Sequence, residues 1–489
     1  MSKPKQRITL SDDEIRAVYA EGEDAVVSLV RQLLDRLDAL ESRLETLEGR
    51  TKKTSRNSHK PPSGDGLGKR TKSLRTKSDK SSGGQPGHPG HTLEWSETVD
   101  WIDTHDVKTC SRCNESLRDV PVEQWFARQV FDIPAIELMV TEHRVAVKCC
   151  GGCGHQSQGN FPEEARTVVQ YGSRLKAMMV YLMERQLLPS ERICEIFRDL
   201  LGVNVSEGTL YTSRTYCYHQ LDSMERGIQS TLVNSSKVHF DETGMRVNGQ
   251  LWWLHVACTD GLTYYFVHPK RGTVAMNEMA ILPEFKGKAV HDGWKSYAGY
   301  ACDHFLCNAH HLRELRFILE HYDQWWAYQL SLLLVTILHQ VQAAKANGQT
   351  ALPDDQRKAF EARYADILAQ GFAANPLATP SSDAPKKRGR PKRSPPRNLL
   401  ERLKAQQASV LGFMVDFEVP FDNNQAERDL RMMKLKQKIS GCFRSVDGAR
   451  MFCRIRGYLS TLRKQGQNIL DALMELFSSK PLTLIPQAK

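Results

Sequence analysis

The sequence predicts a multidomain α+β protein, and three observations support this prediction. At 489 residues the chain is too long for one hydrophobic core, since cores stop growing near ~250 to 300 residues. Helical, low-complexity and strand-like stretches follow one another along it. Three acids, Asp241, Asp292 and Glu427, fall in strand, strand and helix contexts in that order.

The composition indicates a reducing compartment. No stretch approaches the ~18 consecutive apolar residues of a membrane span, and the first residues lack the apolar core of a signal peptide. We therefore expect a cytosolic protein that makes no membrane contact. Five of the 12 cysteines lie between Cys110 and Cys153, which in such a compartment indicates metal ligands rather than disulfides.

Residues 1–49 are predicted to form a coiled-coil helix. Apolar residues recur there at spacings of 4, 3, 4, 3, 4 and 3: Val26, Val30, Leu33, Leu37, Leu40, Leu44 and Leu47. This heptad seam favours self-association as a homodimer or higher oligomer. The alternative is one amphipathic helix that packs on its own domain. Gly49 is expected to end the helix.

Residues 50–98 are predicted to be a basic, disordered linker. Eleven Lys or Arg residues lie between Arg50 and Lys80, and stretches such as GGQPGHPGH offer little apolar surface to offset chain entropy. A second basic tract covers 385–397. Both tracts favour contacts with a polyanion, although two solvated linkers would have the same composition.

Residues 99–165 are predicted to form a zinc ribbon. Cys110 and Cys113 form one CxxC pair, and Cys150 and Cys153 form a second pair after 36 intervening residues. Four thiolates suit a structural, tetrahedral Zn²⁺ site. Alternating, strand-like sequence lies between the pairs (FARQVFDIP and LMVTEHRVAVK). Cys149 or His155 could replace a ligand, and unliganded thiols are the alternative.

Residues 166–232 are predicted to be a helical, helix-turn-helix-like DNA-binding domain. Gly202 breaks the helical pattern, and Ser206 is a candidate N-cap of the next helix. In a DNA-reading motif the contacts would come from Thr209, Tyr211, Ser213 and Arg214. Plain helix packing explains the same pattern equally well.

Residues 233–310 change to strands. KVHFDETGMRV, QLWWLHVACT and LTYYFVHP are separated by Asn-Gly and Asp-Gly turns, which predicts a three-stranded meander. Asp241 interrupts the first strand, where a buried charge is costly unless it is paired or binds metal. A helical piece follows, and then a short strand that ends at Asp292, before Gly293.

This order is that of a ribonuclease-H-like domain, in which strands one and four are neighbours. Two carboxylates on adjacent strands and a third acid from a later helix would hold two Mg²⁺ ions, or Mn²⁺, for phosphodiester chemistry. The third acid lies in FDNNQAERDLR, where Asp422 or Asn423 can cap a helix and Glu427 falls near its first turn.

Residues 311–410 are predicted to form a helical insertion. Near its start five residues could form a second metal site, with a packed helix start as the favoured alternative: Cys302, His304, Cys307, His310 and His311. At its end the basic residues Arg388, Arg390, Lys392 and Arg393 resemble an AT-hook, an arm that enters the minor groove of DNA. A plain charged loop is the alternative.

Residues 411–489 should complete the catalytic core and add C-terminal helices. They carry basic residues that could bind DNA along the opening of the active site: Arg428, Arg431, Lys434, Lys436, Lys438, Arg444, Arg450, Arg454 and Arg456. Arg428, Arg431, Lys434 and Arg444 are the favoured DNA contacts. A solvated basic face is the alternative.

HFDETG, VHDGW and NNQAERDLR resemble the three acidic motifs of the large transposase of the bacterial insertion-sequence-sixty-six family. The resemblance extends to NSHKPPSGD, the two CxxC pairs, RGRPKRSP and the segment from SGCFRS onward. One departure is KCCGGCGH, where Cys149 stands beside the expected cysteine.

The resemblance implies an Asp-Asp-Glu enzyme that cleaves the ends of an insertion sequence and transfers the 3′-hydroxyl to target DNA. Asp241, Asp292 and Glu427 match its catalytic positions, and Asp422 and Asp429 do not. It also implies double-stranded DNA as substrate, a place at the bacterial nucleoid, and accessory proteins from the same element. A zinc-ribbon regulator, or a nuclease that cuts without joining, remains the alternative.

Overall fold

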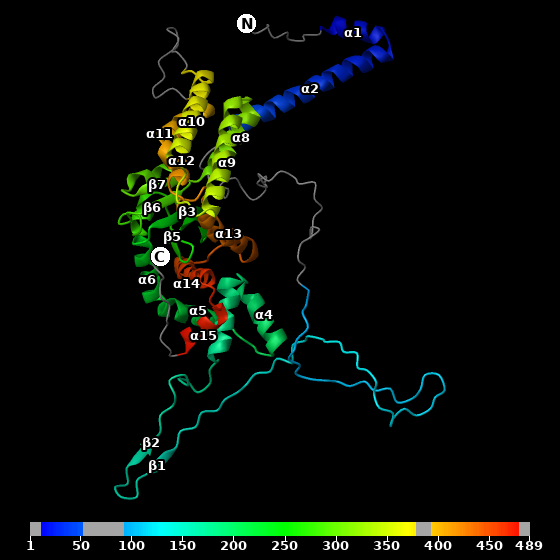
Figure 1. The fold of residues 1–489 in the computed structure, drawn as a ribbon, viewed down its shortest axis with the longest axis vertical. Helices are drawn as coiled ribbons and strands as arrows, with labels where there is room; N and C mark the ends of the chain where they lie inside the picture. Colours follow the sequence, from blue (N-terminus) through cyan, green and yellow to red (C-terminus); the bar gives the residue numbers. More distant parts are fainter. Residues whose placement is uncertain (1–10, 52–91, 378–392, 479–489) are drawn as a thin grey trace. The chain divides into compact units, whose positions relative to one another are not determined.

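The computed structural model describes residues 11–51, 92–377 and 393–478 (Figure 1). Contacts divide the chain into two units. The smaller unit contains residues 92–161 and 194–205, and the rest of the described chain belongs to the larger one. Most of the predicted basic linker, and Arg388, Arg390 and Lys392 of the AT-hook-like tract, lie outside the described residues.

The N-terminal segment forms two helices, α1 (Asp12–Ala20) and α2 (Glu23–Thr51). The prediction that Gly49 ends the helix is wrong, because α2 continues past it. One glycine destabilises a helix by only about 1 kcal/mol, which a helix of 29 residues tolerates. Four of the predicted seam residues are exposed along α2: Val30, Leu33, Leu37 and Leu40. A second helix would bury this seam, and the coiled coil stays a prediction.

Apart from residues 194–201, which form most of helix α4 (Ser190–Leu201), the smaller unit contains little regular structure. Its strands β1 (Val147–Cys149) and β2 (Gln156–Gln158) pair in antiparallel fashion beside the second cysteine pair. The strands expected between the two pairs are otherwise wrong, since residues 120–146 form none. Alternation alone did not produce a sheet there, because side chains such as Phe126 and Val130 remain exposed and no core covers them.

Helices form within residues 166–232, the range predicted to be a helical domain, although most of α4 belongs to the smaller unit. The elements are α3 (Ser173–Val180), a π-helical turn η2 (Tyr181–Arg185), α4 (Ser190–Leu201), α5 (Glu207–Gln220) and α6 (Asp222–Val233). Gly202 has a positive φ of 65°, which glycine adopts at little cost. The Ser206 side chain accepts a hydrogen bond from the Thr209 N–H and caps α5. The break and the cap are therefore confirmed.

A mixed, five-stranded sheet forms the centre of the larger unit. Its strands are β3 (Lys237–Val247), β4 (Gln250–Cys258), β5 (Thr263–His268), β6 (Lys288–His291) and β7 (Asp303–Leu306). The order is β5-β4-β3-β6-β7. β3 to β5 form the predicted antiparallel meander, and β6 is parallel to both β3 and β7. The predicted adjacency of the first and fourth strands is confirmed, whereas β7 was not predicted.

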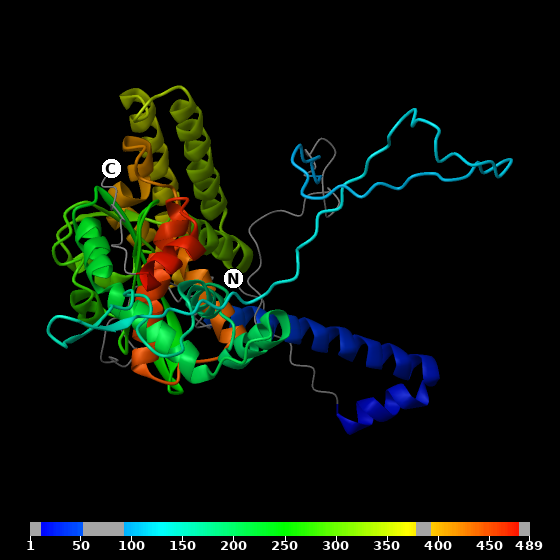
Figure 2. The same ribbon diagram turned by 90° about the horizontal axis from the view of Figure 1, so that it is seen from below.

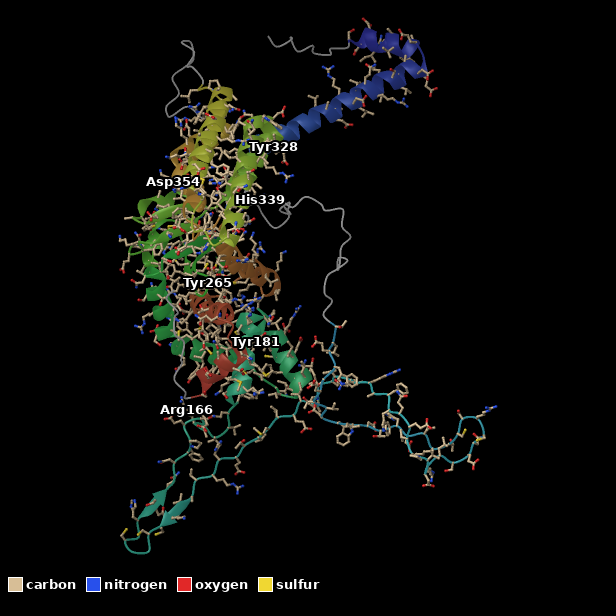
Figure 3. The ribbon with its side chains drawn as sticks, in the orientation of Figure 1. Arg166, Tyr181, Tyr265, Tyr328, His339 and Asp354 are labelled. Carbon is tan, nitrogen blue, oxygen red and sulfur yellow. The ribbon has the colours of Figure 1, made fainter. Side chains whose placement is uncertain are left out.

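Helices cover both faces of the sheet. On one face α13 (Asn424–Ile439) and α14 (Val446–Lys464) bury apolar residues of β3, β4 and β5. Tyr265, labelled in Figure 3, belongs to this core, and its hydroxyl donates to the Asp429 carbonyl (2.7 Å). On the other face α6 and α7 (Thr273–Glu278) pack around Phe240, Phe285 and Tyr297. This two-sided burial fixes the strand ends that carry the acids.

The predicted insertion is a separate helical core at one end of the sheet. Its helices are α8 (Asn308–Tyr322), α9 (Trp325–Ala346), α10 (Asp354–Ala374), α11 (Pro395–Ala405) and α12 (Gln407–Val415). They share one apolar cluster with Leu306 of β7, and Figures 1 and 2 both show them standing together. No helix within the described ranges is long and apolar enough to cross a membrane.

The last described helix, α15 (Ile469–Phe477), packs with α3, α5 and α14 around a fourth apolar cluster. A short 3-10 turn, η3 (Lys295–Gly299), follows Asp292 and contributes Tyr297 to the core beneath β3. The segments on both sides of the insertion, η3 before it and α13 and α14 after it, thus pack against the same sheet.

Candidate active site

The three predicted acids lie at one end of the sheet. β3 and β6 are parallel neighbours whose register pairs His239 with Val290. Asp241 and Asp292 each follow that pair by two residues, so they lie next to each other where the pairing of the two strands ends. Glu427 stands in the first turn of α13, a helix packed against β3. The fold thus brings together acids from three separate elements.

Asp241 lies in a strongly negative environment. Burial raises the pKa of its carboxyl group well above the usual range, and the charges of Glu242, Asp292 and Glu427 raise that pKa further. The N–H of Glu242 donates to Asp241 Oδ1 (2.8 Å) and opposes the shift. The strongest charges acting on Asp241 are all negative, so a cation at this position would be favoured.

Asp292 is buried, with 7% of its surface exposed. Burial, followed by the charge of Glu242, raises the pKa of Asp292 to about 7, although the Trp294 N–H and Arg271 act in the opposite direction. The Trp294 N–H donates to Asp292 Oδ1 (2.8 Å), and Arg271 Nη2 lies 3.8 Å from Oδ2. Gly293, at a φ of +81°, allows the tight turn that makes this N–H available.

An ion pair between Arg271 and the buried Glu242 supports the two aspartates, and no sequence pattern predicted it. Arg271 donates from Nε to Glu242 Oε1 (2.7 Å), while the Tyr297 hydroxyl donates to Oε2 (2.6 Å). The Arg271 guanidinium carbon lies 4.1 Å from the centre of the Trp294 ring and 5.2 Å from that of Trp253. These aromatic faces hold the guanidinium in place. No local sequence signal joins residues from four separate segments.

The other acids near Glu427 have different partners. Asp422 Oδ1 accepts from the Asn424 N–H (3.0 Å), two residues further along at the start of α13. Asp429 accepts from Lys464 Nζ (2.7 Å). Glu427 Oε1 instead lies 3.4 Å from Arg313 Nη2 and 3.9 Å from His310 Nδ1. Of these three acids, Glu427 is the one whose charge raises the pKa of Asp241, and its role as the third acid stays a prediction.

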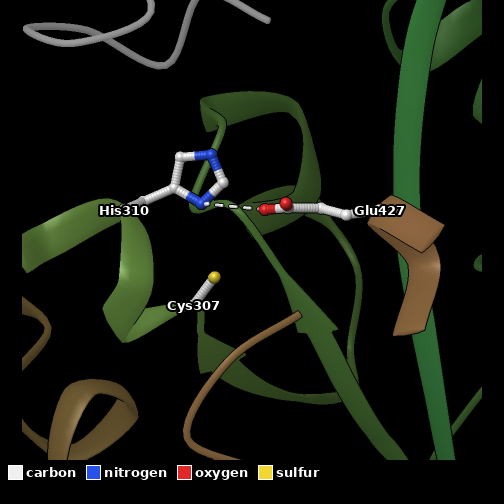
Figure 4. A group of neighbouring side chains, drawn as sticks. All are labelled: Cys307, His310 and Glu427. Atoms are coloured by element: carbon white, nitrogen blue, oxygen red, sulfur yellow. Dashed lines mark ion pairs between the residues drawn. The ribbon is translucent and has the colours of Figure 1, made fainter. Parts of the chain in front are cut away.

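The predicted cluster of five possible metal ligands separates in the structure. Cys302, His304 and His311 make contacts elsewhere: for example, His304 Nδ1 lies 2.9 Å from His291 Nε2, and His311 Nδ1 lies 3.0 Å from Asn308 Oδ1. Cys307 and His310 remain together and gather with Glu427, so that the ligand atoms of all three lie within 4.8 Å of one another (Figure 4). Burial raises the pKa of Cys307 to about 12.

Several predicted DNA contacts are exposed on α13 and in the loop after it. Arg428, Arg431 and Lys434 lie on the solvent side of α13, and Arg444 follows in an exposed loop. Arg454 and Arg456 belong to the interior instead. Arg454 pairs with Glu225 and Asp222, and the buried Arg456 donates to the carbonyls of Glu184 and Arg185. Arg393 forms an ion pair with Glu401.

The four residues proposed as DNA contacts of a helix-turn-helix differ in how buried they are. Ser213 is buried, and Arg214 forms an ion pair with the buried Glu184 and donates to the Gly448 carbonyl (2.8 Å). Tyr211 is exposed, and Thr209 serves the helix cap. Helix packing accounts for Ser213 and Arg214, which the sequence pattern could not distinguish from readers.

The two cysteine pairs adopt the same turn. The Cys110 carbonyl accepts from the Asn114 N–H (2.9 Å), and the Cys150 carbonyl accepts from the Gly154 N–H (2.8 Å). Asn114 and Gly154 both have positive φ angles, 64° and 71°. In each turn backbone N–H groups lower the pKa of the first cysteine, Cys110 or Cys150. Among the described side chains the four sulfurs do not gather into one group, so the zinc ribbon stays a prediction.

Two family models match parts of this chain. A family model described as the Transposase IS66 family matches residues 168–451, which cover more than half of the chain, the whole five-stranded sheet and all three acids. A second model, described as a family of unknown function, matches residues 2–94. A search among curated proteins gave no match. The chain therefore belongs to the IS66 transposase family.

Proposed function

We propose that this protein is the Asp-Asp-Glu DNA transposase of a bacterial insertion sequence, with a ribonuclease-H-like catalytic domain. One observation carries the proposal: Asp241 in β3 and Asp292, directly after the parallel neighbour β6, share a negative site beside the helix whose first turn bears Glu427. Such an arrangement is costly unless a cation compensates it.

The residues at this site fit divalent metal ions. The charges of Glu242, Asp292 and Glu427 raise the pKa of Asp241, and carboxylate oxygens are the ligands that Mg²⁺ prefers. We assign Asp241, Asp292 and Glu427 as ligands of two Mg²⁺ ions, which Mn²⁺ could replace. Bound metal ions would activate a water or hydroxyl nucleophile and stabilise charge on the phosphate.

The chain's own residues position the substrates. Arg271 and Glu242 hold the loop that carries Asp292. Arg428 and Arg431, exposed on α13 beside Glu427, would bind DNA phosphates and set the scissile bond against the carboxylates. The reaction comprises hydrolysis at an element end and in-line attack of the freed 3′-hydroxyl on target DNA, without a covalent protein intermediate.

Three further assignments belong to the same proposal. The equivalent turns at Cys110–Cys113 and Cys150–Cys153 suit one structural Zn²⁺ ion, with Cys149 and His155 as alternative ligands. The exposed seam of α2 suits a homodimer or higher oligomer. Accessory proteins of the same element complete the expected set of partners.

The decisive experiment incubates the purified chain with Mg²⁺, DNA that carries the element's ends, and a target plasmid. The proposal predicts both cleaved ends and joined products. In Ca²⁺ the wild type and Asp241→Ala should bind the ends equally, and only the wild type should cleave them in Mg²⁺. Cleavage without joining from a precut end would indicate a nuclease, and binding without cleavage a regulator.

A further inference from the structure

A group of mixed metal-ligand atoms lies beside the proposed magnesium site. Cys307 offers a thiol, His310 an imidazole nitrogen and Glu427 a carboxylate oxygen, all within 4.8 Å of one another (Figure 4). Among the side chains that the structure describes, this is the one such group of three or more residues. Glu427 belongs both to it and to the proposed set of magnesium ligands.

The surrounding fold holds the group in place. Cys307 and His310 are three residues apart at the start of α8, a spacing that puts both on one side of a helix. The Cys307 N–H donates to the His291 carbonyl at the end of β6 (3.0 Å), and Cys307 Sγ accepts from the Asn423 N–H (3.2 Å). The Asn423 side chain in turn donates to the Phe240 carbonyl (2.8 Å). Such outer contacts orient metal ligands.

The chemistry of the three ligands suits a thiophilic cation. Zn²⁺ takes sulfur at about 2.3 Å and nitrogen or oxygen at about 2.0–2.2 Å, which places tetrahedral ligand atoms roughly 3.3–3.7 Å apart. His310 Nδ1 and Glu427 Oε1 are 3.9 Å apart, so small side-chain rotations would close the site. Mg²⁺ prefers oxygen ligands and would avoid the sulfur.

The site is open on one side. Cys307 is buried, whereas 16% of the His310 side chain and 27% of the Glu427 side chain are exposed. A cation could enter past these two residues, and three protein ligands would leave a fourth position for water. Arg313 Nη2, 3.4 Å from Glu427 Oε1, would have to move aside because it repels a cation.

We propose that Cys307, His310 and Glu427 bind a zinc-type divalent cation, and that this binding withdraws Glu427 from the magnesium site and inhibits DNA cleavage. The inhibition rests on the proposed function, because Glu427 is there the third magnesium ligand. Binding replaces the S–H bond of Cys307 with a metal–sulfur bond and releases the proton to solvent. Excess zinc would thus suppress transposition without occupying the aspartates.

Cobalt is the probe for the site, because a Co²⁺–thiolate bond absorbs in the near ultraviolet. Full-length, metal-stripped wild type should bind one more Co²⁺ per chain than Cys307→Ser or His310→Gln. Cys302→Ser, which changes a nearby thiol outside the group, should match the wild type. The CxxC cysteines are present in every variant and cancel in the comparison. Equal stoichiometry in the wild type and in folded Cys307→Ser and His310→Gln would overturn the proposal.

The inhibition is measured as the ratio of cleavage with and without added Zn²⁺, at fixed Mg²⁺, within each variant. Zn²⁺ should inhibit the wild type and Cys302→Ser at a concentration about tenfold or more below that needed for His310→Gln. An identical zinc dependence in these three proteins would contradict the inhibitory role. If the wild type does not cleave in Mg²⁺ alone, the proposed function fails, and the cobalt stoichiometry still decides the metal site.

Discussion

The acidic end of the sheet and the two cysteine turns assemble their functional residues in different ways. Asp241, Asp292 and Glu427 come from separate elements, and apolar cores on both faces of the sheet bring them together. The cysteine turns are each built by local hydrogen bonds, while nearby apolar side chains such as Phe126 stay exposed. Burial thus preorganises the first site, whereas a shared ligand would have to join the two turns.

One expected difference between the two regions is the response of the smaller unit to chelation. If one Zn²⁺ ion joins the two turns, chelation should raise the rate of proteolysis within residues 92–161 by about 100-fold, because metal binding supplies most of the folding free energy of such units. Residues 206–377 should keep their protection. Mass spectrometry of the fragments measures the proteolysis rates of both regions. Unchanged proteolysis of residues 92–161 would contradict a shared Zn²⁺ ion.

Two phenylalanine substitutions sharpen the same comparison. Phe240 is 2% exposed and packs against Phe285 and Tyr297, so Phe240→Ala should lower the free energy of unfolding by about 3–5 kcal/mol. Phe126 is 87% exposed, and Phe126→Ala should change it by less than about 0.5 kcal/mol. Urea denaturation followed by circular dichroism compares them, and equal losses would mean that Phe126 is also buried.

The sequence predicted the strands and the helix that carry the three acids better than it predicted the residues that hold these acids in place. Strand pattern and turn chemistry located Asp241 and Asp292, because both signals are local. β7 was missed because its four residues lie among cysteines and histidines that suggested metal ligands. The Glu242–Arg271 pair could not be foreseen, since only tertiary packing joins it. Between the cysteine pairs the strand prediction failed, because the alternating pattern predicted strands that no core stabilises.

The pH dependence of the metal-free protein tests the charge at the acidic end. Asp292, with a pKa of about 7, holds its proton in the folded chain at pH values where the unfolded chain has lost it, so stability falls as the pH rises from about 4 to 7. Asp292→Asn should therefore raise the free energy of unfolding at pH 8 by on the order of 1–3 kcal/mol. The gain should shrink towards pH 4. A pH-independent gain would contradict the assigned cause.

The smallest expected effect concerns the exposed cations of α13. Arg431→Ala should weaken binding to any DNA sequence severalfold and reduce the slope of log affinity against log salt by about one, because one phosphate contact is lost. Arg316→Ala is the matched control, since Arg316 is exposed on α8 and paired with Glu320. Fluorescence anisotropy at several salt concentrations measures the slopes. Equal slopes in both variants would mean that Arg431 does not contact a DNA phosphate.

The choice of the third acid tests the central claim most directly. Cleavage of element-end DNA in Mg²⁺ should be compared for the wild type, Glu427→Gln and Asp422→Asn at equal DNA occupancy. Glu427→Gln should lose about 1,000-fold in rate, because a metal ligand worth several kcal/mol is removed. Asp422→Asn keeps an oxygen that can accept from the Asn424 N–H and should stay within about tenfold of the wild type. Cleavage by Glu427→Gln at the wild-type rate would contradict the assignment of Glu427 as a metal ligand.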